Sequence, residues 1–153
     1  MKSQLKIANW LLELDSNQTQ KFYAKGVDVC NCAYCSNFTA SAGRMSSKFI
    51  ALLAALGIDP KMPAELSEFP SNEEGLHTYL GFYHFTGTII EGELTTSSTW
   101  KESNTLKLDN FTIGFSTELM FVPEDFPAPV LQLEFEVDLP WVLEPLDKTA
   151  DNQ

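Results

Sequence analysis

Segment 131–139 alternates strictly between apolar and polar residues, and it constrains the fold of this chain more than any other segment. Its apolar positions are Leu131, Leu133, Phe135, Val137 and Leu139, and its polar positions are Gln132, Glu134, Glu136 and Asp138. Because successive side chains of a β-strand point to opposite faces of a sheet, this pattern predicts a strand with one face in the core. The other face carries a row of carboxylates that repel one another, so it should meet solvent or a cationic partner.

A second strand is predicted over residues 76–90, which are rich in aromatic and β-branched side chains and are interrupted by two glycines. Apolar residues occupy both odd and even positions, as is typical of a strand in the middle of a sheet, and the glycines permit a bulge or bend. Shorter strands are expected over residues 66–69 and 111–121. Residues 94–105 are rich in Ser and Thr, have no hydrophobic period apart from Trp100, and predict a loop or an irregular hairpin.

Helical signals are confined to the first part of the chain. Asp15, with a glutamine three positions later, is typical of a helix start and predicts a helix over residues 16–25. Ser36 predicts the start of a second short helix that runs toward Gly43. Ser46 or Ser47 predicts the start of a third helix, which Gly57 should end. The third helix should bury a stripe made of Phe49, Leu52, Leu53 and Leu56.

Residues 5–14 fit both a strand and one face of a helix, and we favour a strand. The change from helical to alternating periodicity predicts an α+β fold. In this fold, short N-terminal helices pack on a mainly antiparallel β-sheet formed largely by residues 65–145. For a chain of 153 residues we expect a single domain over residues 1–147 and a loose C-terminal tail over residues 148–153.

The sequence favours a cytoplasmic protein that is not an enzyme. No apolar run approaches the ~20 residues that a membrane-spanning helix needs, and the N-terminus lacks the apolar stretch of a signal peptide. We therefore expect no membrane partner and reduced cysteines. The chain contains no serine nucleophile motif, phosphate-binding Gly-rich loop or dinucleotide fingerprint. The acidic pairs at residues 73–74 and 124–125 fall in predicted turns, where solvated carboxylates are more common than catalytic ones.

The charge is distributed unevenly along the chain. Residues 1–61 hold seven basic and four acidic side chains, a balance of +3, whereas residues 62–153 hold three basic and seventeen acidic ones, a balance of −14. An acidic surface repels the phosphate backbone of nucleic acids and so argues against a nucleic-acid partner. It attracts basic protein surfaces and accelerates association with them, although acidity also serves solubility alone.

All three cysteines, Cys30, Cys32 and Cys35, lie within six residues of one another. Zinc prefers thiolate and imidazole ligands, so these thiols could bind zinc with His84 or His77 as the fourth ligand, and with Asp28 as a weaker alternative. Cys32 and Cys35 before a helix also fit a thiol-redox pair, although no βαβ unit surrounds them. Packing of reduced cysteines in a tight loop is the third interpretation, and the sequence leaves all three open.

These features lead to two functional hypotheses. The first is an acidic protein-interaction module, such as an immunity protein or antitoxin-like neutraliser, that binds a basic protein partner through Glu134, Glu136 and Asp138. The alternative is a small zinc-binding or thiol-redox protein that uses Cys30, Cys32 and Cys35, with His84 completing the metal site. No cofactor other than zinc is expected, and the oligomeric state is not predicted.

Overall fold

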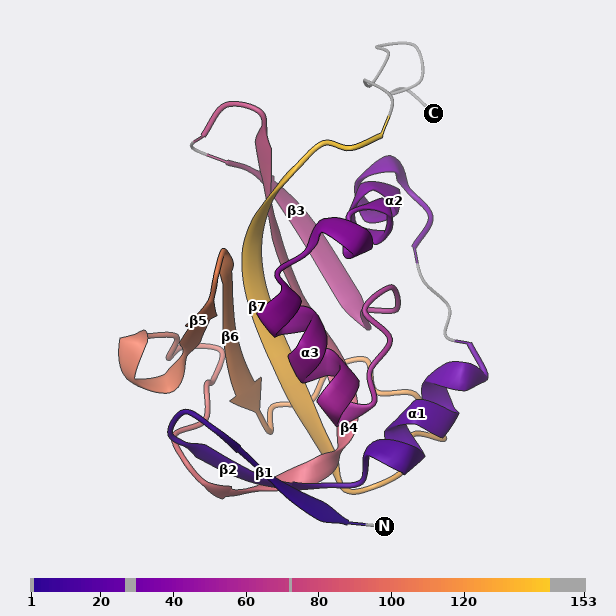
Figure 1. Cartoon of the computed structure of the whole chain (residues 1–153), viewed down its shortest axis with the longest axis vertical. Coiled ribbons are helices and arrows are strands. Elements are labelled where there is room, and N and C mark those ends of the chain that lie inside the picture. Colours follow the sequence, from indigo (N-terminus) through magenta and orange to yellow (C-terminus); the bar gives the residue numbers. More distant parts are fainter. Residues whose placement is uncertain (1, 27–29, 72, 144–153) are drawn as a thin grey trace.

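The structure is a computed structural model that describes residues 2–26, 30–71 and 73–143, and it confirms the α+β fold class (Figure 1). The described residues form three α-helices, α1 (Ser16–Ala24), α2 (Ala33–Ala40) and α3 (Ser47–Leu56). The strands are β1 (Ser3–Ile7), β2 (Trp10–Leu14), β3 (Glu65–Pro70), β4 (Leu76–Glu91), β5 (Leu106–Leu108), β6 (Phe111–Ser116) and β7 (Val130–Pro140). Two 3₁₀ turns, η1 (Ala42–Arg44) and η2 (Glu102–Asn104), connect them. The expected loose tail at residues 148–153 lies outside the described residues.

The seven strands form one antiparallel sheet, with the order β1-β2-β4-β7-β6-β5 and with β3 also paired to β4. The long strand β4 organises the sheet. Its first half lies between β3 and β7, and its last residues pair with β2. The sheet therefore extends beyond the predicted range of residues 65–145, because the hairpin of β1 and β2 joins it from the N-terminal end of the chain.

The packing of the helices on one face of the sheet follows from the parity of the strand residues. Odd-numbered residues of β4, β6 and β7 face the helices, and this helix face of the sheet is buried under α2 and α3. Phe49 of α3 stacks on Phe111 with ring centroids 3.8 Å apart, and Phe38 of α2 stacks on Phe135 at 5.5 Å. The predicted apolar stripe of α3 is buried, as are all five apolar residues of the alternating segment. Even-numbered residues point to the opposite side, which we call the open face.

Helix α1 covers a gap along the edge of β4. The residues of β4 that pair with β3 end at Phe82, and those that pair with β2 begin at Gly87. Between them, the Tyr23 hydroxyl donates to the backbone oxygen of His84 at 2.9 Å, and the hydroxyl of Thr19 accepts the N–H of Thr86 at 2.8 Å. The side chains of α1 thus satisfy the buried backbone groups that no strand reaches.

The structure corrects three predicted elements. Residues 5–14 form a hairpin rather than one strand, because Ala8 takes a positive φ of 50° between β1 and β2. Strand β6 ends at Ser116 rather than near residue 121, because the Ser116 hydroxyl accepts the N–H of Glu118 and the chain turns away from the sheet there. Helix α2 begins after Cys32 rather than at Ser36, because the Cys32 sulfur accepts the N–H of Cys35 and acts as the N-cap.

Candidate functional site

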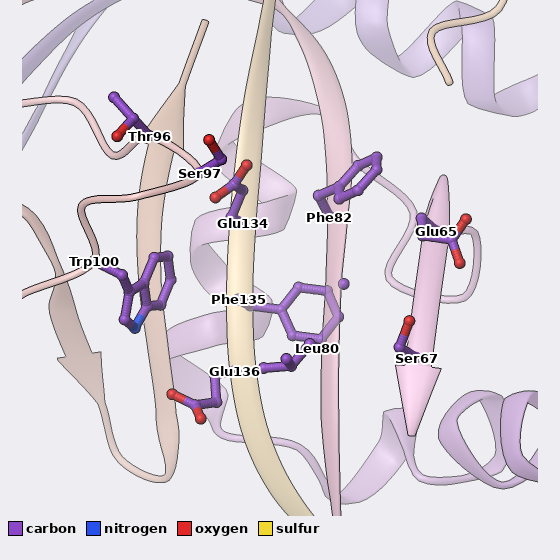
Figure 2. A pocket seen from close by; sticks show the side chains of 11 residues that line it. Glu65, Ser67, Leu80, Phe82, Thr96, Ser97, Trp100, Glu134, Phe135 and Glu136 are labelled. Carbon is purple, nitrogen blue, oxygen red and sulfur yellow. The ribbon is translucent and has the colours of Figure 1, made fainter. Parts of the chain in front are cut away.

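The open face of the sheet holds a groove of about 380 Å³ that crosses β3, β4 and β7 (Figure 2). Its main charged and apolar walls are Glu65, Leu80, Phe82, Trp100, Glu134 and Glu136. Two of the three predicted partner-binding residues therefore lie together in one concave site. The third, Asp138, continues the row on β7 outside the groove, and its carboxylate accepts the hydroxyl hydrogen of Thr78.

Strand register places an apolar side chain beside each carboxylate of the groove. Phe82 of β4 lies opposite Glu134 on one side and opposite Glu65 on the other. Leu80 lies opposite Glu136 in the same way. Directly opposed side chains of an antiparallel pair have Cβ atoms about 5 Å apart, so each glutamate of the groove stands next to an apolar side chain.

The wall that carries Trp100 belongs to the loop of residues 94–104, which we call the Trp100 loop. The buried side chain of Asn104 closes this loop. Its amide nitrogen donates to the backbone oxygens of Thr99 at 2.9 Å and Leu94 at 3.3 Å, and its side-chain oxygen accepts the Lys101 N–H at 2.8 Å. These three bonds hold the loop in one conformation beside the groove.

The Trp100 loop rests on β6 at the position of Gly114. Thr95 donates both its N–H, at 2.8 Å, and its hydroxyl, at 3.1 Å, to the Phe115 backbone oxygen. A Cβ at residue 114 would overlap the Thr95 methyl group and would lie 3.2 Å from Cζ3 of Trp100. The loop reaches the sheet, and Trp100 reaches the groove, because residue 114 has no side chain.

The groove is lined by three carboxylates, those of Glu65, Glu134 and Glu136. In the part of the chain that the structure describes, none of Glu65, Glu134 and Glu136 forms an ion pair. Glu134 is partly buried and accepts a hydrogen bond from the Gln132 side-chain nitrogen at 2.8 Å, and its other oxygen lies 3.4 Å from the Thr95 hydroxyl oxygen. Glu136 is exposed. This arrangement is suited to binding a cationic group.

His84 is a buried polar residue at the end of the open face next to the groove. Its Nε2 lies 2.9 Å from the Gln132 side-chain oxygen, which also accepts the Met120 N–H. Because that oxygen can only accept, Nε2 of His84 carries the hydrogen. Burial lowers the pKa of His84, although the Gln132 bond opposes this effect. His84 faces away from the helices and does not join the cysteines, which lie at the start of α2.

The three cysteines form a compact cluster in which all Sγ atoms lie within 4.8 Å of one another. Cys30 and Cys32 are exposed, and Cys35 is half-buried in the first turn of α2. The Cys32 N–H points at the Cys30 sulfur, and the Cys35 N–H points at the Cys32 sulfur, each at 3.5 Å. Such N–H groups stabilise thiolates, so the cluster can hold a metal ion.

The pKa values of two of these thiols are displaced in opposite directions. Partial burial disfavours the Cys32 thiolate, but hydrogen bonds from the Cys35 N–H and from the neighbouring thiols outweigh it and lower the pKa of Cys32. Burial raises the pKa of Cys35, and interactions with Cys32 and Cys30 raise it further. In the metal-free protein Cys32 is therefore the more acidic thiol of the two.

Hydrogen bonds fix the cysteine cluster to one end of the sheet. The buried Asn37 of α2 donates to the Tyr79 hydroxyl at 3.2 Å and to the Pro140 oxygen at 3.1 Å, and it accepts the Val142 N–H at 2.7 Å. Tyr79 in turn donates to the Tyr34 oxygen at 2.7 Å. The cluster is thus held over the helix face of β3 and β4.

A cavity of about 200 Å³ beside the cluster is lined by Cys32, Cys35 and Glu68, among others. Nδ1 of His77 lies 2.7 Å from the Glu68 carboxylate, and the His77 ring centroid lies 6.2 Å from that of Tyr34. Of the two histidines considered as ligands, His77 is therefore on the side of the cysteines. Asp28, the weaker alternative, lies outside the described residues.

Sequence reasoning missed Glu65, Glu68, Phe82 and Trp100 as site residues. Trp100 had one available signal, since it is the single aromatic side chain in a Ser/Thr-rich segment. The glutamates lie on β3, where residues of opposite parity face different sides of the sheet, so Glu65 enters the groove and Glu68 enters the cysteine cavity. To assign each glutamate to a face of the sheet, one must know that β3 pairs with β4 and in which register.

Within the described ranges, no helix is long and apolar enough to cross a membrane. Comparisons of the chain with protein-family models, with curated proteins and with solved structures found no match in any of the three.

Proposed function

We propose that this protein binds a basic segment of a protein partner in the acidic groove of the open face. The observation that carries the proposal is the placement of Glu65, Glu134 and Glu136 beside the apolar walls formed by Phe82 and Trp100. Among the described residues, none of these carboxylates has an ion-pair partner. An Arg or Lys side chain matches both features, since its charge complements the carboxylates and its stem or planar head packs on aromatic rings.

The contributions expected from such a contact are modest individually. A cation over an aromatic ring contributes about 0.5–2 kcal/mol, and a partly exposed ion pair about 0.2–1 kcal/mol. Several basic side chains are therefore needed for tight binding, which favours a protein segment over a free amine. The balance of −14 over residues 62–153 would steer a basic partner toward this face at low salt. A neutraliser of a basic protein, such as an immunity protein or antitoxin, would use a surface of this kind.

Charge reversal with a matched control tests the proposal. The variant Glu134→Lys/Glu136→Lys and the control Glu73→Lys/Glu74→Lys change the net charge equally, but residues 73 and 74 lie exposed in the turn between β3 and β4. We expect titration calorimetry with an arginine-rich peptide to show at least about a tenfold loss of affinity, about 1.4 kcal/mol, for the groove variant alone.

High salt should weaken wild-type binding, since the contact is largely electrostatic. Equal affinities of the groove variant and the turn control would show that only net charge matters, and this would refute the groove as the binding site.

A second candidate function, zinc binding, is supported by one specific observation, the approach of the Sγ atoms of Cys30, Cys32 and Cys35 to within 4.8 Å of one another. We expect elemental analysis of reduced protein to find stoichiometric zinc that is lost in Cys32→Ser. The thiol-redox alternative predicts instead a metal-free protein in which mild oxidation joins Cys32 and Cys35 in a disulfide. Metal-free protein with three unreactive thiols would refute both.

A further inference from the structure

We infer that Glu68 is the fourth ligand of the zinc site formed by Cys30, Cys32 and Cys35, and that His77 orients Glu68 through its hydrogen bond. This inference rests on the zinc-binding function proposed above and adds the ligand that the cysteines lack. Glu68 takes the place of His84 as the fourth ligand, because the His84 ring lies on the open face and is hydrogen-bonded to Gln132.

The first step is the incomplete ligand set. Structural zinc sites are almost always four-coordinate and tetrahedral, and Cys, His, Asp and Glu supply their donors. Among the residues that the structure describes, the cluster with mutually close donor atoms contains the three cysteines alone. One position of the tetrahedron therefore remains for a side chain that lines the space next to the sulfurs.

The second step is the position of Glu68. It lies on the helix face of β3 opposite Tyr79, and it lines the cavity of about 200 Å³ shared with Cys32 and Cys35. Its side chain is only 16% exposed. Among the described residues that line this cavity, Glu68 is the one carboxylate, and carboxylate oxygen is an accepted zinc ligand.

The third step is the role of His77. Its Nδ1 lies 2.7 Å from one Glu68 oxygen, which leaves the other oxygen of the carboxylate for the metal. The imidazole itself packs against the rings of Tyr34 and Trp141, with centroids 6.2 Å and 5.2 Å away. Hydrogen-bonded partners of this kind fix the orientation of metal ligands in general.

The fourth step is the charge of the site. Three thiolates and a carboxylate exceed the charge of one zinc ion, so neighbouring cations favour the complex. Lys61 and Cys30 together line two further cavities, and Lys61 supplies one such cation. The site therefore combines the three cysteines and Glu68 with a lysine that lines the same cavities as Cys30.

Zinc affinities of full-length variants test the inference. Reduced protein is titrated with zinc alone in competition with a chromophoric chelator, using wild type, Glu68→Gln, His77→Gln and the control His84→Gln. Loss of a hydrogen-bonded outer partner typically weakens metal binding by about 10–100-fold, so we expect that loss for His77→Gln and at least as large a loss for Glu68→Gln. His84→Gln should bind zinc as tightly as wild type.

The absorption spectrum of the cobalt-substituted protein tests directly whether Glu68 binds the metal, because a purely structural role of Glu68 would leave this spectrum unchanged. The thiolate-to-cobalt charge-transfer band should persist in Glu68→Gln, because the three sulfurs remain, whereas the ligand-field bands should shift when the oxygen ligand is replaced. Urea unfolding of the metal-free variants checks that each is folded.

The outcomes separate the two proposals. Wild-type zinc affinity and an unchanged cobalt spectrum in Glu68→Gln would overturn the role of Glu68 and leave a three-thiol site intact. Failure of wild type itself to bind zinc would overturn the zinc function and this inference together.

Discussion

Replacement of Gly114 by alanine tests whether the Trp100 loop depends on the absence of a side chain at this position of β6. The added Cβ would overlap the Thr95 methyl group and would lie 3.2 Å from Trp100 Cζ3 and 3.3 Å from the Asn104 backbone oxygen. Thr95 cannot retreat without losing its two hydrogen bonds to the Phe115 oxygen. The loop must therefore shift as a unit or strain the strand.

The expected cost follows from two opposing effects. Overpacking of a close contact costs about 1–3 kcal/mol, whereas replacing Gly by Ala stabilises by about 0.4–1 kcal/mol through the unfolded chain. We therefore expect Gly114→Ala to lower the free energy of unfolding by about 0.5–2 kcal/mol. It should also weaken binding of the arginine-rich peptide, because displacement of the loop moves Trp100 away from the groove.

Urea unfolding and peptide titration measure both effects, and Gly43→Ala is the matched control. Gly43 has no atom within 4 Å of an added Cβ and no positive φ, so alanine there should leave stability and binding unchanged or slightly raise stability. The double variant Gly114→Ala/Thr95→Ser removes the overlapping methyl group, keeps the hydroxyl and should recover part of the loss. If Gly114→Ala matches Gly43→Ala in both assays, the loop does not depend on Gly114.

Three further predictions concern the residues that hold the fold together. Asn37→Ala should lower the free energy of unfolding by about 2–4 kcal/mol in urea titrations, because it removes the bonds to Tyr79, Pro140 and Val142 and leaves buried groups unpaired. A loss as small as that of a typical surface substitution would contradict this prediction. Phe49→Ala should lower the free energy of unfolding by about 3–5 kcal/mol in the same assay, because Phe49 is fully buried between α3 and the sheet. Wild-type stability of this variant would show that Phe49 is not central to the core. Burial lowers the pKa of His84 in the folded protein below its usual 6.5. As the pH falls below 6.5, the unfolded chain therefore takes up a proton at His84 before the folded protein does, and the free energy of unfolding should decrease. His84→Asn should reduce this pH dependence, and an identical slope in wild type and variant would refute it.

The elements that the sequence predicts well are those with a single dominant periodicity. Segment 131–139 has an unambiguous alternation, and β7 has the face assignment that this alternation predicts. Helix α3 likewise follows from its apolar stripe and from Gly57, which takes a positive φ of 86° at its C-cap. Residues 5–14 were less informative, because the turn at Ala8 depends on the pairing of β1 with β2 and of β2 with the edge of β4.

The N-terminus of α2 illustrates a competition that local sequence rules do not resolve. Ser36 is a good N-cap by residue type, but the Cys32 sulfur accepts the Cys35 N–H and the helix begins four residues earlier. Tertiary contacts hold the helix in place, since Asn37 donates to Tyr79 of β4 and to Pro140 of β7. The same contacts place the cysteines at the helix start beside Glu68.

The sequence by itself determined the α+β class, the acidic face of β7 and the proximity of the three cysteines, because each depends on periodicity or spacing along the chain. Tertiary structure decided which residues complete the two candidate sites. Glu65 and Trp100 join Glu134 across β3, β4 and β7, and Glu68 joins the cysteines on the opposite side of the sheet. These groupings follow from strand order, register and the missing side chain at Gly114, which arise from long-range packing and leave no local signal.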